Sequence, residues 1–410
     1  MKEKTKLFST LVNFSLLLCS VILLVPNKFK AYPIILLGLF SILHYCKSDN
    51  RQKFPFKKVG LLSIVFILFA ISVSYTEDLA SAFSKLSTMA SLLIFPVIFS
   101  LLDTSGYTLK NAFLKRFFLC FIVSNILFAI LTFCYFWNQE FTFSETIVHY
   151  SNLTNIRLGT YSIHPIYHSL YIGVALLMLV HLIKFDTSLF NKIGYALIFV
   201  FFGMVMAILM RKGPIIYLAL SLLLLMLFYF KMKRALLAVG VLVVIIAFSI
   251  QYLPKYKGIN RFEELMSIGN SNAKTSTNAR LDIYLCAFEK IKEKPFLGYG
   301  AGAVQPYLDA CYAEKKITFD DNTKTYNSHN QYLSIALTVG VLGLVLYLLS
   351  LYPIIRVYIR QKSFLGLSIL VYFLLNFLSE NIIEREHGVL LYAMLLCIFF
   401  YKKDELYNCP

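Results

Sequence analysis

The chain has 410 residues, of which 58% are hydrophobic and only 15% are charged. Soluble globular proteins carry about 25% charged residues, so this composition excludes an ordinary water-soluble protein. The formal net charge of +17 would suit a nucleic-acid partner in a soluble protein. In a membrane protein the same excess comes from lysines and arginines that orient the chain, and we expect no nucleic-acid partner.

Apolar runs long enough to cross a bilayer, which takes about 20 helical residues, recur along the whole chain. The first run follows a basic N-terminus without a small-residue cleavage site, so we interpret it as a retained helix and not as a secretory leader. The predicted spans are residues 7–25, 31–46, 59–74, 79–102, 116–137, 161–183, 193–210, 213–230, 235–253, 331–352, 364–379 and 389–401. The sequence therefore predicts an all-α, polytopic integral membrane protein of about twelve transmembrane helices, with residues 1–410 in a single membrane domain.

Lysine and arginine are distributed unevenly between the two sides of these spans. Segments 1–6, 47–58, 110–116, 184–192, 231–234, 356–362 and 402–403 contain 21 of them, whereas the opposite short connections contain six. Cytoplasmic connections retain the positive charge, so both termini are predicted to be cytoplasmic. The longest polar segment, residues 254–330 between the ninth and tenth spans, then faces outward, together with the connections 138–160 and 380–388.

Eight cysteines are scattered without a C-x-x-C pair, so metal ligation is not supported. Only Cys286 and Cys311 lie in the outward segment, where a disulfide can persist. The spacing leaves a disulfide and two free thiols open, and we favour two free thiols.

Part of the outward loop has the pattern of an amphipathic helix lying on the membrane surface. Its apolar residues at helical spacing are Leu281, Tyr284, Leu285, Phe288 and Ile291. Capping residues precede this helix and Pro295 follows it, which places Arg280 in the first turn. A guanidinium beside free helix N–H groups suits a phosphate or diphosphate, although a side chain that only reaches toward lipid headgroups is an equal alternative.

The turn after this helix is rich in glycine and contains Gly298 and Gly300, which are candidates for contacts with a substrate phosphate. A dinucleotide-binding loop requires a preceding strand, and this turn follows a helix. A tight re-entrant turn is therefore the favoured interpretation.

His329 ends the loop, directly before a predicted span. The positive end of that helix favours a neutral imidazole, which can accept a proton from a hydroxyl as a general base. A histidine bonded only to loop backbone is the alternative. Asn330, beside it, is a further candidate for substrate binding.

Three other outward turns contain candidate side chains. Arg211 and Lys212 form a tight connection on the side that the charge rule leaves poor in cations, which favours an anionic lipid-linked ligand. His164 and His168 lie one helical turn apart near Tyr167, but no third metal ligand is evident. Glu380 begins a charged turn, where a carboxylate could orient His329, bind sugar hydroxyls or belong to a solvated salt-bridge cluster.

These segments resemble the O-antigen ligase and polymerase superfamily of bacterial polysaccharide assembly. The resemblance rests on Met210-Arg211-Lys212-Gly213, on Arg280 with Pro295-Phe296-Leu297-Gly298-Tyr299-Gly300, and on Ser328-His329-Asn330-Gln331-Tyr332 with Gly340 and Gly343. The patterns His164-Pro165-Ile166-Tyr167 and 380–388 resemble some branches of the family. The chain departs from the family at Lys212, where a small residue is common, and at Tyr284, where a tryptophan is common.

The resemblance implies an inverting, metal-independent glycosyl transfer without a cofactor, in the bacterial inner membrane. The donor would be a glycan linked to undecaprenyl diphosphate, and the acceptor a hydroxyl of lipid A-core or of a growing polysaccharide. It also implies that His329 is essential and that Arg280 and Arg211 engage the diphosphate. The candidates for substrate binding are Lys212, Asn330, Gly298, Gly300, His164, Tyr167 and Glu380.

Three alternatives to a ligase remain open from the sequence. A repeat-unit polymerase uses the same donor with another acceptor, and a protein O-oligosaccharyltransferase transfers glycan to protein. A transporter would also suit twelve helices. However, two-halved transporters usually have a long link between helices six and seven, whereas the link here, Lys184–Lys192, is short.

Overall fold

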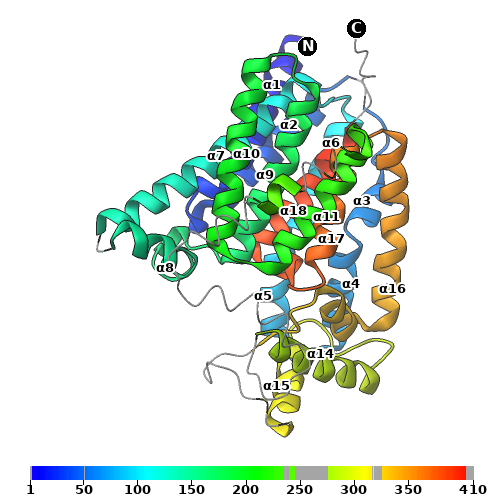
Figure 1. Cartoon of the computed structure of the whole chain (residues 1–410). Helices are drawn as coiled ribbons and strands as arrows, with labels where there is room; N and C mark the ends of the chain where they lie inside the picture. The colour runs from blue at the N-terminus through cyan, green and yellow to red at the C-terminus, as the bar shows by residue number, and fades with distance from the viewer. Residues whose placement is uncertain are drawn as a thin grey trace.

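The computed structural model describes residues 2–49, 51–139, 141–233, 236, 240–244, 276–315, 317 and 326–402. Within these ranges the chain is helical and contains no β-strand (Figure 1). The α-helices are α1 Lys2–Ser20, α2 Ala31–Lys47, α3 Phe56–Leu62, α4 Ile64–Ser72, α5 Leu79–Met89, α6 Ser91–Thr104, α7 Asn111–Gln139, α8 Phe143–Ile156, α9 Pro165–Phe185, α10 Leu189–Leu209, α11 Lys212–Tyr229, α14 Ser276–Glu293, α15 Val304–Glu314, α16 Gln331–Arg360, α17 Phe364–Asn376 and α18 Glu386–Tyr401. Short 3₁₀ helices are η1 Ile22–Leu24, η2 Asn27–Phe29, η3 Val73–Tyr75, η4 Gly159–Tyr161 and η5 Ile382–Glu384.

Among the described residues, seven helices are long and apolar enough to cross a membrane. The bent pair of α3 with Ile64–Tyr75 would add an eighth, and Lys6–Ser20, Phe364–Asn376 and Glu386–Tyr401 are shorter apolar helices. The all-helical prediction is confirmed, and every predicted span except 235–253 has a helical counterpart. Most of 235–253 lies outside the described residues, so the count of twelve stays a prediction.

One span that the hydropathy predicts as continuous is sharply bent. The segment 59–74 bends by 76° between α3 and Ile64–Tyr75, whereas α5 and α6 join at Ala90 into one candidate span, Leu79–Thr104. A hydropathy window reports how much apolar surface a segment carries and not whether its axis is straight. Here α3 packs on α6 while α4 packs on α16, so the two halves of the bent segment contact different helices.

The structure also contains two helices that the sequence analysis did not identify, α8 and α15. Thr142 and Glu145 form a capping box at the start of α8, with reciprocal hydrogen bonds between each side chain and the other's backbone N–H. This T-x-x-E pattern is a recognised sign of a helix start, so the sequence did contain the signal.

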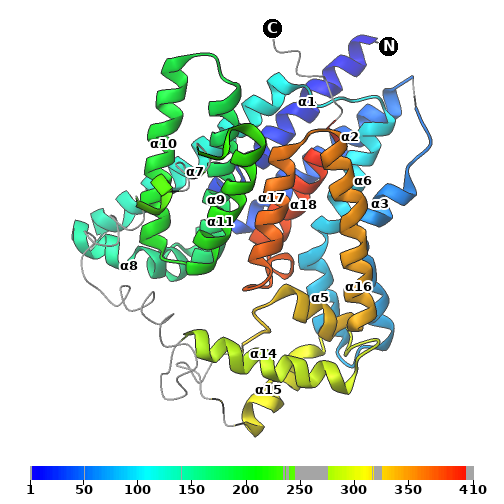
Figure 2. The ribbon, with the colours of Figure 1, turned by 45° about the vertical axis from the view of Figure 1, so that its right-hand side comes forward.

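Figures 1 and 2 show how the helices of the bundle are arranged. Helices α14 and α15 lie together at one end, while α1 begins and α18 ends at the opposite end. The central helix α9 is buried along almost its whole length, which explains why it is apolar on all faces. The connection between α10 and α11 and the connection between α17 and α18 both lie at the end that faces α14 (Figure 2).

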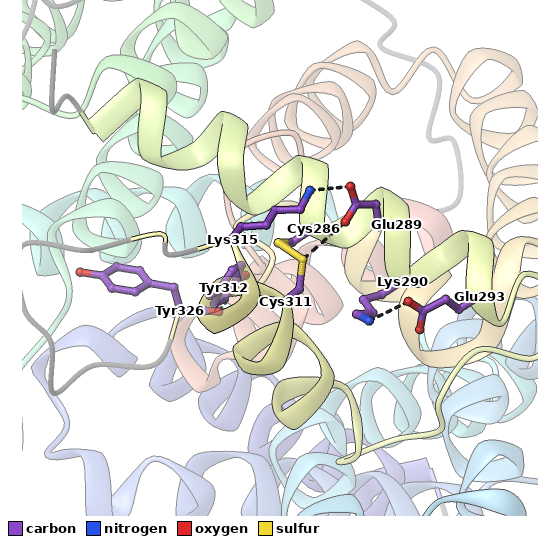
Figure 3. The surroundings of a disulfide bond; sticks show 8 residues. All are labelled: Cys286, Glu289, Lys290, Glu293, Cys311, Tyr312, Lys315 and Tyr326. Atoms are coloured by element: carbon purple, nitrogen blue, oxygen red, sulfur yellow. Dashed lines mark hydrogen bonds and ion pairs between the residues drawn. A yellow bond between two sulfur atoms is a disulfide. The ribbon is translucent and has the colours of Figure 1, made fainter. Parts of the chain in front are cut away.

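Helices α14 and α15 have a small hydrophobic core of their own, which includes Ile283, Tyr299 and Leu308 and reaches Leu337 of α16. A disulfide between Cys286 and Cys311 joins the two helices within this core (Figure 3). The expectation of two free thiols was therefore wrong, because helix packing brings the Cα atoms to 5.8 Å. Close to the disulfide, Lys315 pairs with Glu289 across the two helices (Figure 3).

Candidate functional site

His329 lies two residues before α16 and has a left-handed backbone, with φ of 43°. Its N–H donates to Oδ1 of Asn327 over 2.9 Å, which stabilises this turn. The left-handed region costs a non-glycine residue about 1 kcal/mol, and such strain is concentrated at functional sites. Asn330 then caps α16, since its Oδ1 accepts the N–H groups of Tyr332 and Leu333 and its Nδ2 donates to the Leu378 carbonyl. The side chain of Asn330 is thus engaged in holding the site in place.

The imidazole of His329 faces the turn that follows α17. Its Nδ1 lies 3.3 Å from Oε2 of Glu380, and the His329 side chain is 24% exposed whereas that of Glu380 is only 7% exposed. Burial by itself raises the pKa of Glu380, but the hydrogen bond from His329 and the positive charge of Arg280 hold it below the ordinary value. The buried, ionised carboxylate of Glu380 therefore accepts a hydrogen bond from Nδ1 of His329, and the rest of the imidazole remains accessible to a ligand.

Arg280 and Tyr284 lie one turn apart on α14 and approach the same place. The Tyr284 hydroxyl donates to the Leu378 carbonyl over 2.9 Å and to the His329 carbonyl over 3.2 Å. Burial raises the pKa of Tyr284, and the positive charge of Arg280 opposes that rise. The guanidinium is also close enough to Glu380 to lower its pKa. The hydrogen bonds of Tyr284 therefore hold α14 against the turn that contains Glu380, and Arg280 lies close to that carboxylate.

Arg211 reaches the site from the turn between α10 and α11. Its Nη2 donates to Ser151 Oγ of α8 over 3.1 Å. The turn passes through Met210, whose φ is 49°, and Gly213, where an added Cβ would lie 3.0 Å from Ser379 Oγ. The glycine therefore allows the Arg211 turn to pack closely beside the residue that precedes Glu380.

His164 caps α9, because its Nδ1 accepts the Ile166 N–H over 3.4 Å. Burial lowers the pKa of His164 to about 4, with the positive charge of Arg211 acting in the same direction and Glu380 opposing it. Arg211, His329 and Glu380 thus lie close enough to His164 to affect its pKa, and Arg280 and His329 lie close enough to Glu380 to do the same there. Five separate segments of the chain thus contribute to a single site.

The remaining candidates occupy varied positions. The Tyr167 ring lies 6.1 Å from that of His164, and its buried hydroxyl has no hydrogen-bond partner among the described residues. Lys212 begins α11 directly after Arg211. His168 is fully buried against the Phe128 ring. Within the described ranges, no three His, Cys, Asp or Glu side chains form a group that could hold a metal.

Gly298 and Gly300 have a structural role in the turn that follows α14. The N–H groups of residues 298, 299 and 300 donate to the carbonyls of Lys294, Leu337 and Thr338. A Cβ at Gly298 would lie 2.4 Å from the Leu337 carbonyl oxygen, and one at Gly300 would lie 2.9 Å from Thr76. These contacts dock the turn on α16 where Gly340 interrupts that helix.

A buried ion pair that the sequence analysis did not use stabilises the turn that contains Glu380. Lys85 Nζ of α5 lies 2.6 Å from Glu384 Oε2, and Gln331 Nε2 donates to the other oxygen of Glu384 over 2.7 Å. Gln331 Oε1 in turn accepts the Ile383 N–H over 3.0 Å. The sequence signal for this network was Lys85 itself, because a single lysine within an apolar run is costly and needs a partner.

Residues 196–348 match the family model described as O-Antigen ligase. A search of curated proteins found no match. The matched region contains Arg211, Arg280 and His329, whereas Glu380 and His164 lie outside it. The match confirms the resemblance to the O-antigen ligase superfamily that the sequence indicated, over the region from α10 into α16.

Proposed function

We propose that the protein is an O-antigen ligase-type glycosyltransferase of the bacterial inner membrane. It moves a glycan from undecaprenyl diphosphate to an acceptor hydroxyl, on lipid A-core or a similar acceptor, at the outer face, and both termini are cytoplasmic. The observation that carries this proposal is the pairing of His329 with the buried Glu380 beside two arginines. The family match and the disulfide in the outward loop support it, because disulfides persist outside the cytoplasm.

The proposed chemistry follows from which nitrogen of His329 is engaged. Glu380 accepts the proton on Nδ1, which leaves Nε2 as the basic nitrogen that faces a ligand. Nε2 takes the proton of the acceptor hydroxyl while its oxygen attacks the anomeric carbon. The bond from that carbon to the diphosphate oxygen breaks on the opposite face, so the configuration inverts and no metal takes part.

Arg280 and Arg211 have the complementary role in this proposal. Negative charge develops on the departing diphosphate as the glycosidic bond breaks, and preorganised guanidinium groups stabilise it. The two arginines come from different elements, α14 and the α10–α11 turn, so they could bind opposite sides of a diphosphate. Lys212 and the buried hydroxyl of Tyr167 are further proposed contacts for the donor or acceptor.

The decisive test is a His329→Ala variant of the full chain, produced in cells that lack the native gene. We expect glycosylated product to fall by about two to four orders of magnitude, as for loss of a general base. His149→Ala is the matched control, and membrane insertion is measured for both. Normal product from an inserted His329→Ala protein would contradict the proposal.

The same cells distinguish ligase from polymerase. Loss of ligation leaves long chains on the lipid carrier, whereas loss of polymerisation leaves single repeats on the acceptor. A gel of lipid-linked and acceptor-linked glycan separates these outcomes, and glycan found on protein would indicate protein O-glycosylation instead.

The diphosphate assignment has its own test. Arg280→Ala should weaken donor binding and Arg280→Lys should restore only part of it, because lysine lacks the planar fork that grips two phosphate oxygens. Unchanged donor affinity in Arg280→Ala would remove Arg280 from the proposed site.

A further inference from the structure

A cavity of about 450 Å³ lies at the end of the bundle opposite His329. It is formed by the start of α7, the ends of α9 and α11, the start of α17 and the end of α18. All of these helix ends lie on the side of the bundle away from α14 and α15 (Figures 1 and 2). The cavity is therefore separate from the proposed glycosyl-transfer site.

The lining of the cavity is strongly basic. Four lysines line it, Lys115, Lys184, Lys362 and Lys402, and among the described residues Asp186 is the only acidic side chain that does so. Lys115 Nζ lies 2.8 Å from Asp186 Oδ2, so these two charges compensate each other. Lys184 and Lys362 add further positive charge to the lining, which favours an anionic ligand.

Part of the wall of the cavity is aromatic. Phe228 at the end of α11 stacks on Phe364 at the start of α17, with ring centroids 4.4 Å apart. Phe185 and Tyr229 are also in the lining and pack edge-to-face at 5.4 Å. A free phosphate ion would use neither this wall nor most of the volume. A phosphate headgroup with attached glycerol and acyl carbons would use both, since aromatic side chains favour the membrane interface.

The position of the cavity also favours a lipid. It is at the end of the bundle where 21 lysines and arginines predict the cytoplasmic side. The cytoplasmic leaflet holds anionic lipids, and basic pockets between transmembrane helices on this side bind their headgroups. We propose that this cavity binds the phosphate headgroup of an anionic phospholipid, such as phosphatidylglycerol, from the inner leaflet. The site uses no residue of the proposed catalytic group, so either proposal can fail while the other stands.

The test uses the purified full-length protein, with native mass spectrometry and thermal unfolding in detergent. Phosphatidylglycerol should remain bound more readily than phosphatidylcholine and raise the unfolding midpoint further. Inorganic phosphate at the same concentration should not raise it. An equal effect of inorganic phosphate would overturn the assignment to a lipid, and equal retention of the two lipids would overturn the assignment to an anion.

The variant Lys184→Gln/Lys362→Gln tests whether phosphatidylglycerol binds in this cavity. Each surface lysine contributes about 1 kcal/mol toward an anionic lipid, so affinity for phosphatidylglycerol should fall about 30-fold. Lys57→Gln, an exposed lysine at the same end outside the cavity, should leave it unchanged. Wild-type affinity in the double variant would contradict the proposal.

A photoactivatable phosphatidylglycerol provides a measurement that does not depend on folded variants. In the wild-type protein it should label peptides that contain residues 181–186 and 362–365. Labelling confined to other peptides would contradict the proposed site.

Discussion

The Nδ1 of His329 and the Oε2 of Glu380 lie 3.3 Å apart although 51 positions separate the two residues in the chain. The carboxylate is buried and the imidazole is partly exposed, so the pair has the arrangement of a general base with an orienting partner.

Glu380→Gln should lower the transfer rate about 10- to 100-fold with little change in the amount of inserted protein. The amide keeps the shape of the side chain but removes the charge that holds the proton on Nδ1, as for other partners that orient a histidine. Initial rates of glycan transfer at pH 7 measure the effect. Glu386→Gln, an exposed glutamate in the same turn, is the control, and a wild-type rate in Glu380→Gln would remove its orienting role.

His164 should make the protein less stable in mild acid. Its pKa is about 4 in the folded protein against an ordinary 6.5, so the unfolded chain binds the proton first as pH falls. The contribution of His164 is complete above pH 6.5 and is lost as pH falls toward 4, by up to about 3 kcal/mol. Unfolding midpoints at pH 7 and pH 4 measure this loss. His164→Asn retains a capping side chain and should lose less stability over that range; an identical pH dependence would contradict the prediction.

Lys85→Met should destabilise the protein by about 3 kcal/mol, because it leaves the buried Glu384 without its cation. The double variant Lys85→Met/Glu384→Gln should recover much of this loss, since no unpaired charge remains. A double-mutant cycle of unfolding midpoints gives the coupling between the two residues. Additive single effects would show that the pair does not stabilise the Glu380 turn.

Gly340→Ala should destabilise the protein by more than about 2 kcal/mol. The residue has a φ of 73°, and an added Cβ would lie 1.9 Å from the Phe296 carbonyl oxygen. Gly194→Ala in α10 is the matched control, because nothing lies within 4 Å of its Cβ and alanine suits a helix better by up to about 1 kcal/mol. Similar midpoints for the two variants would contradict the close docking of the glycine turn on α16.

Replacing both Cys286 and Cys311 by serine should cost about 3 kcal/mol in stability, the usual value for a bridge of this separation. Limited proteolysis should then cleave α14 or α15 faster. Cys134→Ser removes a free, exposed cysteine and should have no such effect. Thiol labelling of Cys286 or Cys311 in intact cells before reduction would show that the bridge is not formed there.

Local signals were sufficient for some of these features. The positions of the apolar helices followed from composition, because the free energy of placing a segment in lipid depends on that segment's own side chains. The α14 helix and the position of Arg280 in its first turn followed from apolar spacing and capping residues. His329 likewise followed from its place directly before an apolar run.

The rest required the tertiary structure. Glu380 was one of several carboxylates in its turn, and nothing local distinguished it as the partner of His329. The disulfide, the Lys85–Glu384 ion pair and the docking of Gly298 on α16 join residues that are far apart in the chain. The sequence by itself determined which segments are helical and apolar, since those properties depend on neighbours within a few turns. Only the tertiary structure decided which side chains meet, because each pairing depends on how separate helices pack and where they bend.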